Sequence, residues 1–104
     1  MEGYAVYSGI IAKEDKGHII KEHLLKVAEE MNGIDDCKAY IVGVDPESND
    51  ALFVYEVWKT KESHDASLQL PIYQVLRDGV RPYILTVRNF PSVNYIAGHA
   101  RFTE

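Results

Sequence analysis

The sequence predicts a single α+β domain with the element order β-α-β-β-α-β, and three observations support this fold class. Its 104 residues, 46% of them hydrophobic, suffice for one domain with one core. Residues 18–31 place their apolar side chains on one helical stripe. Four other segments are rich in aromatic and β-branched residues, as strands are, and these are residues 4–12, 37–44, 51–59 and 81–90.

The first strand and the first helix have clear boundaries. Residues 4–12 carry apolar side chains on both faces, a pattern typical of a strand buried on two sides. Asp15-Lys16-Gly17 then breaks the strand and offers an N-cap for the helix. Asn32-Gly33 ends the helix over 18–31. This part of the chain therefore predicts one amphipathic helix that lies on a sheet.

A hairpin follows the first helix. Residues 45–50 contain Pro, Asn and Asp, which favour turns, and they separate the strands over 37–44 and 51–59. Thr60 is suited to cap a helix over 61–68.

The last part of the chain predicts one more helix and one more strand. Pro71 suits the first turn of a short helix that ends at Asp78-Gly79. The strand over 81–90 ends before Pro91. Residues 91–104 form a tail without an assignable pattern, which could dock on its own subunit or on a neighbour. The apolar side chains available for this docking are Phe90, Val93, Tyr95, Ile96 and Phe102.

This element order is that of a split βαβ unit, the ferredoxin-like fold, with a four-stranded antiparallel sheet and helices on one face. The other face is also apolar, because in the first strand Ala5, Tyr7 and Ile11 alternate with residues of the helix-covered side. A soluble monomer rarely leaves such an apolar area exposed. We therefore expect a homodimer in which two sheets pack face to face and close into a dimeric α/β barrel.

Composition and charge narrow the class of protein. The net charge is −5 and the Lys and Arg residues are scattered, which argues against a nucleic-acid partner. No apolar run approaches the ~20 residues of a membrane span, and the first residues lack a signal-peptide pattern. Cys37 is the only cysteine, so no internal disulfide forms, and we expect an inert thiol. These features predict a cytoplasmic protein without a membrane partner.

A search for catalytic and metal-binding motifs is less informative. His18 and His23 are five residues apart, which places them on different sides of a helix and predicts no metal site there. The sequence has no glycine-rich phosphate loop, nucleophile elbow or HExxH motif. These features alone do not separate an enzyme from a binding module.

Two neighbouring strands carry a more specific signal. Cys37-Lys38-Ala39-Tyr40 opens the second strand, and Phe53-Val54-Tyr55-Glu56-Val57-Trp58 fills the third, before a capped helix. This arrangement resembles the antibiotic biosynthesis monooxygenase (ABM) family, in which a Cys-x-x-Tyr strand precedes a Glu-x-Trp strand. The resemblance covers about residues 4–79. It implies a dimeric α/β barrel and, in some members, oxygenation of quinols, anthrones or related polyphenols without metal, flavin or haem.

The chain departs from the family pattern at one helix. Family members commonly carry a histidine eleven residues after the strand glutamate, where this chain has Ser67. His64 lies almost one turn earlier and could take its place. In the haem-degrading branch an Asn, a Trp and a His stand where this chain has Tyr7, Ser67 and Arg77. Without that histidine there is no proximal iron ligand, and haem degradation is excluded.

The resemblance implies a cofactor-free monooxygenase that deprotonates a small quinol-like or polyphenolic aromatic and passes the electrons to O2. His64 is the expected base and Trp58 the second catalytic residue. Tyr73, Glu56 and Tyr40 are expected to bind the substrate. Each has a structural alternative: Trp58 and Tyr73 in core packing, Tyr40 with its ring buried in the barrel or helix interface, His64 on a solvated helix surface, and Glu56 in a salt bridge across the dimer.

Two other functions stay open. One is a non-catalytic dimeric barrel that binds a small molecule or responds to stress, and the other is an isomerase of a small carbonyl compound. No cofactor and no metal are expected in any of the three.

Overall fold

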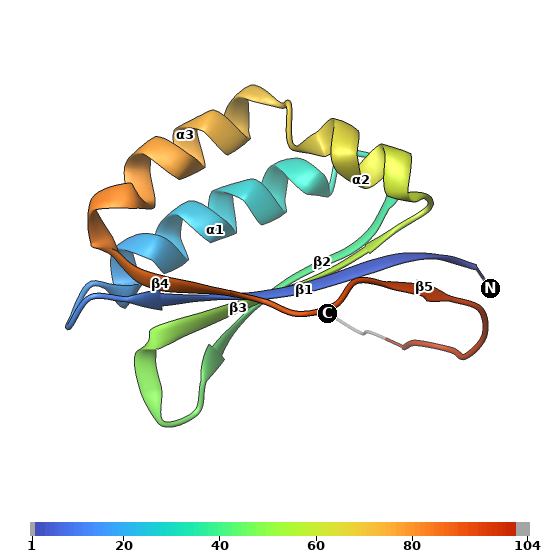
Figure 1. Cartoon of the computed structure of the whole chain (residues 1–104). Coiled ribbons are helices and arrows are strands. Elements are labelled where there is room, and N and C mark those ends of the chain that lie inside the picture. Colours follow the sequence, from blue (N-terminus) through green and yellow to red (C-terminus); the bar gives the residue numbers. More distant parts are fainter. Residues whose placement is uncertain (1, 102–104) are drawn as a thin grey trace.

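An antiparallel sheet carries three α-helices on one of its faces (Figure 1). The structure, a computed structural model, describes residues 2–101. The arrangement confirms the α+β ferredoxin-like fold. The elements are β1 (Gly3–Ala12), α1 (Gly17–Met31), β2 (Cys37–Asp45), β3 (Ser48–Trp58), α2 (Lys61–Ser67), α3 (Pro71–Val80), the 3-10 helix η1 (Arg81–Tyr83), β4 (Ile84–Asn89) and β5 (Val93–Tyr95).

The register of the sheet decides which side chains face the helices. The strand order is β2-β3-β1-β4, and all pairs are antiparallel. Tyr4 lies opposite Trp58, and Ile10 lies opposite Leu52. Because side chains alternate along a strand, these residues share the helix-covered face, whereas Tyr7 and its partner Tyr55 share the other face.

The core lies between this face and the helices. The predicted apolar stripe of α1 is buried against the sheet, and α3 adds a second buried stripe. The hydrophobic burial that stabilises the fold is therefore concentrated on one side of the sheet. The buried residues are Ile20, Leu24, Val27 and Met31 of α1, Leu52, Val54 and Trp58 of β3, and Tyr73, Leu76 and Val80 of α3.

The N-terminus of α1 is capped from a distant strand. The sequence predicts a local cap within Asp15-Lys16-Gly17, but Lys16 stands at the N-cap without a side-chain hydrogen bond. Instead, the Asp50 carboxylate accepts hydrogen bonds from the backbone N–H of Gly17 (2.9 Å) and of Asp15 (3.0 Å). The prediction is wrong because the capping carboxylate comes from the hairpin. Gly17 fits there because any side chain would collide with the Asn49 carbonyl.

Two element boundaries differ from the sequence prediction. The hairpin loop between β2 and β3 is shorter than residues 45–50, because the ladder continues to the pair Asp45–Ser48. Residues 81–83 form a 3-10 turn rather than the start of a strand, since Pro82 fixes its own φ and has no N–H for a ladder.

α3 runs one residue beyond Gly79, to Val80. Gly79 is kept inside this helix by close packing against the His23 ring of α1, which leaves no room for a side chain.

The first part of the C-terminal tail docks on its own chain. Residues Val93–Tyr95 form β5, which pairs with the start of β1 through Gly3 and Ala5. Phe102, expected to take part in docking, lies outside the described residues. None of the helices between residues 2 and 101 has the length and apolar character needed to cross a bilayer.

We predict that Asp50→Ala lowers the melting temperature in a pH-dependent way. The N–H groups of Gly17 and then Asp15 lower the pKa of Asp50 below its ordinary value. A carboxylate whose pKa is lower in the folded state stabilises that state above the unfolded pKa of about 3.9, and this contribution disappears as the pH falls through the folded value.

The difference between wild type and Asp50→Ala, measured by thermal denaturation, should therefore be largest near neutral pH and shrink below about pH 4. Glu47→Ala, in the same hairpin, is the matched control and should change little. An equal loss at low and neutral pH would show that the carboxylate does not act as the cap.

Candidate functional site

The structure brings together the five site residues that the sequence predicts. They lie on the helix-covered side of the sheet, where α2 packs against β1 and β3. We call this group the inner polar cluster, and it consists of Tyr40 of β2, Glu56 and Trp58 of β3, His64 of α2 and Tyr73 of α3.

Glu56 lies at the centre of the inner polar cluster. It is 6% exposed, and its Oε1 accepts a hydrogen bond from Nε1 of Trp58 at 3.0 Å. Burial raises the pKa of the Glu56 carboxyl, while the Trp58 hydrogen bond and charge at His64 lower it in part. Because Glu56 faces the helices, the expected salt bridge across a face-to-face dimer is wrong.

Trp58 is a core residue in this structure. Its side chain is fully buried, and its only N–H is already donated to Glu56. The indole N–H therefore does not face a substrate, in contrast to the expectation that it would line a binding wall. Its place under α2 is the structural alternative that the sequence left open.

His64 is largely buried, so the alternative of a solvated helix residue is wrong. Its side chain is 12% exposed, and its ring lies between Tyr4 (5.5 Å between centroids) and the edge of Trp58 (6.0 Å). The start of α2 is held by a reciprocal cap between Thr60 and Ser63, which confirms Thr60 as the capping residue. His64 is thus placed by a well-anchored short helix.

Two phenols complete the inner polar cluster. Burial raises the pKa of Tyr73 to about 12, and that of Tyr40, opposite Glu56 in the ladder, still further. Among residues 2–101, no group hydrogen-bonds the buried Tyr73 hydroxyl. Tyr40 lies near enough to perturb its pKa, but the two hydroxyls miss hydrogen-bond geometry. An unpaired buried hydroxyl costs about 1–3 kcal/mol, which a bound ligand oxygen would relieve.

An open groove of about 500 Å³ lies beside the cluster, between α2 and the connection from α1 to β2. Its floor reaches Trp58, although the indole has no exposed surface there. Ser67, which stands where the family commonly has histidine, borders it, whereas His64 is turned toward Tyr4 and Trp58. The lining residues are Ile34, Asp35, Asp36, Trp58, Ser63, Ala66, Ser67 and Leu70.

Sequence reasoning singled out only Trp58 and Ser67 among these lining residues. Asp35 and Asp36 lie between two elements and share no motif with α2, so no local signal marks them.

Cys37 lies at the margin of the inner polar cluster as a protonated thiol. Burial, and after it the nearby Glu56, raise its pKa to about 11. Its Sγ donates to the Ala39 carbonyl at 3.5 Å. These observations agree with the expected inert thiol. Within residues 2–101, no group of three or more His, Cys, Asp or Glu side chains is arranged to hold a metal.

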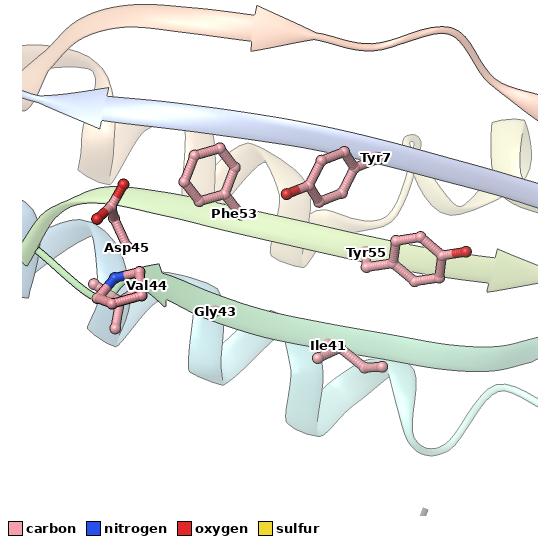
Figure 2. A pocket seen from close by; sticks show the side chains of 8 residues that line it. Tyr7, Ile41, Gly43, Val44, Asp45, Phe53 and Tyr55 are labelled. Carbon is pink, nitrogen blue, oxygen red and sulfur yellow. The ribbon is translucent and has the colours of Figure 1, made fainter. Parts of the chain in front are cut away.

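The opposite face of the sheet is aromatic and exposed in the single chain. Figure 2 shows Tyr7, Phe53 and Tyr55 standing on this face of β1 and β3. They line a shallow hollow of about 330 Å³, where the Tyr7 and Phe53 rings stack at 5.9 Å. We call this surface the outer face, and its exposed apolar residues are Tyr7, Ile41, Tyr55, Phe90 and Val93.

Comparison with known proteins agrees with this architecture. The family model "Antibiotic biosynthesis monooxygenase" matches residues 4–78. A crystal structure of a candidate antibiotic biosynthesis monooxygenase from Chloroflexus aurantiacus is 29% identical, with a TM-score of 0.81 over 96% of this chain and 98% of that chain.

Two more distant structures share the fold. A candidate antibiotic biosynthesis monooxygenase from Nitrosomonas europaea is 20% identical, with a TM-score of 0.76 over 92% of this chain and 88% of that chain. A Pseudomonas aeruginosa protein is 11% identical, with a TM-score of 0.84 over 93% and 97% of the two chains. No functionally curated protein matches the sequence significantly. The family match covers most of the chain, and the chain belongs to the antibiotic biosynthesis monooxygenase family.

Proposed function

We propose that this protein is a cofactor-free monooxygenase that oxidises a small quinol-like or polyphenolic aromatic. The observation that carries the proposal is the inner polar cluster, because ionisable side chains gathered in an apolar interior are typical of a catalytic site. Family membership supports the same reaction class.

The reaction needs a proton acceptor and a donor for the developing oxyanion. We assign the acceptor to His64 and the donor to Tyr73, whose hydroxyl has no other partner in the described chain. Loss of a proton gives a carbanion or enolate, which passes one electron to O2. The resulting radical and superoxide combine to a hydroperoxide after protonation, and loss of water leaves a carbonyl on the substrate. One O2 thus supplies one oxygen atom to product and one to water.

Glu56 and Trp58 hold the other side chains of the site in position from the sheet side. Their hydrogen bond fixes the indole and orients the carboxylate next to Tyr40, which faces it across the β2–β3 ladder. The substrate would approach through the groove at α2. Because Trp58 is fully buried beneath α2, contact between a substrate and the indole itself would require this seven-residue helix to move outward on binding.

The proposed assembly is a homodimer joined through the outer face. In the single chain Tyr7 is 38% and Tyr55 44% exposed, although both lie in the middle of the sheet. A second copy of the same sheet would cover these rings and close the barrel.

Isomerisation of a small carbonyl compound is a second candidate, because a free Tyr73 hydroxyl stabilises an enolate whether or not O2 is present. A small-molecule binder without turnover is the third. The experiment below separates the three.

We predict O2 consumption with anthrone- or quinol-type substrates by protein treated with chelators. His64→Ala should lower kcat about 100- to 10,000-fold, the usual contribution of a general base. Tyr73→Phe should lower kcat about 100-fold or more, because it removes one oxyanion donor. The measurement is oxygen-electrode turnover combined with product analysis.

Glu62→Gln, an exposed change in the same helix, is the control and should keep full activity. Product formed under anaerobic conditions would indicate the isomerase instead. A thermal shift with these ligands but no product would indicate a binding protein. Unchanged turnover in His64→Ala would refute the assigned base.

We predict that Glu56→Gln changes how stability depends on pH. The amide oxygen can still accept the Trp58 N–H, while the ionisable group is lost. Because the folded pKa of Glu56 is raised, the carboxyl stabilises the protein fully below its unfolded pKa, near 4.3, and this contribution declines as the pH rises through the folded value.

In urea denaturation, Glu56→Gln should gain stability relative to wild type as the pH rises from about 4 to 8. Glu29→Gln, on the exposed side of α1, should show no such trend. A gap between wild type and Glu56→Gln that is constant over this range would contradict a raised pKa.

We predict that the wild-type protein is a dimer of twice 11.8 kDa at micromolar concentration, and that Tyr55→Glu is monomeric. The added carboxylate would be buried without a partner in the interface. Light scattering coupled to size-exclusion chromatography measures both masses. Leu25→Glu is the matched control, since Leu25 is 49% exposed but lies on α1. A wild-type monomer would refute the assembly, and so would a Tyr55→Glu dimer as stable as wild type.

A further inference from the structure

We propose that Asp65 is a positioning residue that holds His64 in one tautomer, with Nε2 as the nitrogen that accepts the proton. The inference rests on the proposed function, since His64 is the assigned base. It concerns the hydrogen bond made by Nδ1 of the imidazole, which the assignment of His64 as the base does not use.

The geometry of the pair defines the tautomer. Nδ1 of His64 lies 3.0 Å from Oδ1 of Asp65. An ionised carboxylate only accepts hydrogen bonds, so Nδ1 carries the proton when the ring is neutral. A neutral imidazole has one N–H, and Nε2 is therefore left with a free lone pair. The same division of roles orients the histidine in carboxylate–histidine pairs generally.

Asp65 is itself held in place. Its Oδ2 accepts from Nζ of Lys61, one turn earlier, at 2.7 Å. The hydrogen bond from Lys61, and after it the one from His64, lower the pKa of Asp65 below its ordinary value. Asp65 is thus ionised at neutral pH, with one oxygen for each neighbour. Lys61 and Asp65 are both exposed, so the pair stabilises the fold little and its effect is mainly on the orientation of the carboxylate.

The rest of the surroundings fix the ring without competing for Nδ1. Tyr4 of β1 and Trp58 of β3 pack against the ring, and the buried Glu56 lies close enough for charge at His64 to lower its pKa in part. Ser67 Oγ donates to the His64 backbone carbonyl at 2.6 Å, which anchors the residue within α2. Trp58 donates to Oε1 of Glu56, and Asp65 is the carboxylate that lies within hydrogen-bond distance of the imidazole.

The test is nitrogen-15 NMR of the histidine side chains in the full-length protein at about pH 9, where an ordinary imidazole is neutral. His64 is assigned from the signal lost in His64→Gln. We expect the wild-type ring to be protonated at Nδ1, whereas free histidine favours the Nε2–H form. In Asp65→Ala the ring should change to predominantly Nε2–H. Glu62→Gln, which removes a neighbouring charge without contact to His64, should leave the wild-type tautomer.

A second measurement uses the proposed substrates. Asp65→Ala should lower kcat about tenfold or more with KM little changed, because orientation of the base is part of the ~100- to 10,000-fold that general bases contribute. Asp65→Glu keeps a carboxylate at this position and should restore part of the Nδ1–H tautomer and part of kcat.

Each outcome decides the inference. An Nε2–H tautomer in wild type overturns it, and so does an Nδ1–H tautomer that persists in Asp65→Ala. A tautomer change without loss of kcat would overturn the positioning role. The NMR result is obtained without substrate, so a protein that shows no oxygenation would refute the proposed function while the tautomer of His64 still decides this inference.

Discussion

The inner polar cluster is organised by one buried hydrogen bond, from the Trp58 indole to the Glu56 carboxyl. Residues two apart on a strand face the same side, so β3 brings both polar groups into the apolar layer beneath the helices. Either group buried without a partner would be costly. Each satisfies the other, and the largest side chain of the core is held at a defined angle beneath α2. The His64 ring packs against that indole and against the Tyr4 ring.

Burial also disfavours the charged forms of the surrounding groups. Tyr40, Tyr73 and Cys37 are protonated at neutral pH at their ordinary pKa values, and burial raises those pKa values further. A site lined by protonated groups offers hydrogen-bond donors, which suit a ligand oxygen that becomes negative. Glu56 is the exception among these groups, because its Oε1 accepts a hydrogen bond from Trp58. The cluster thus combines an acceptor already in use with a Tyr73 donor that has no partner in the described chain.

Apolar periodicity and capping residues were enough to predict β1 to β4, the three α-helices and their order, because both are local properties of the sequence. The cap from Asp50 and the pairing of Val93–Tyr95 with β1 were not predictable, since both join segments far apart in the chain. At the site, residue types suggested the five side chains. Their hydrogen-bond partners required the register of β3 and the position of α2, which is why Trp58 was expected to offer an N–H that it has already donated.

The two faces of β3 have different chemistry, and this separates assembly from reaction. Tyr55 points to the outer face, whereas its neighbours Val54 and Glu56 point to the helices. A partner subunit on the outer face would therefore contact the strand that carries the cluster without contacting the cluster itself. Dimer formation and the reaction could therefore be coupled through movement of β3. A central strand that is hydrogen-bonded on both sides resists such movement. In the proposed function the substrate would enter at α2, which lies on the helix-covered side of the sheet, away from such an interface.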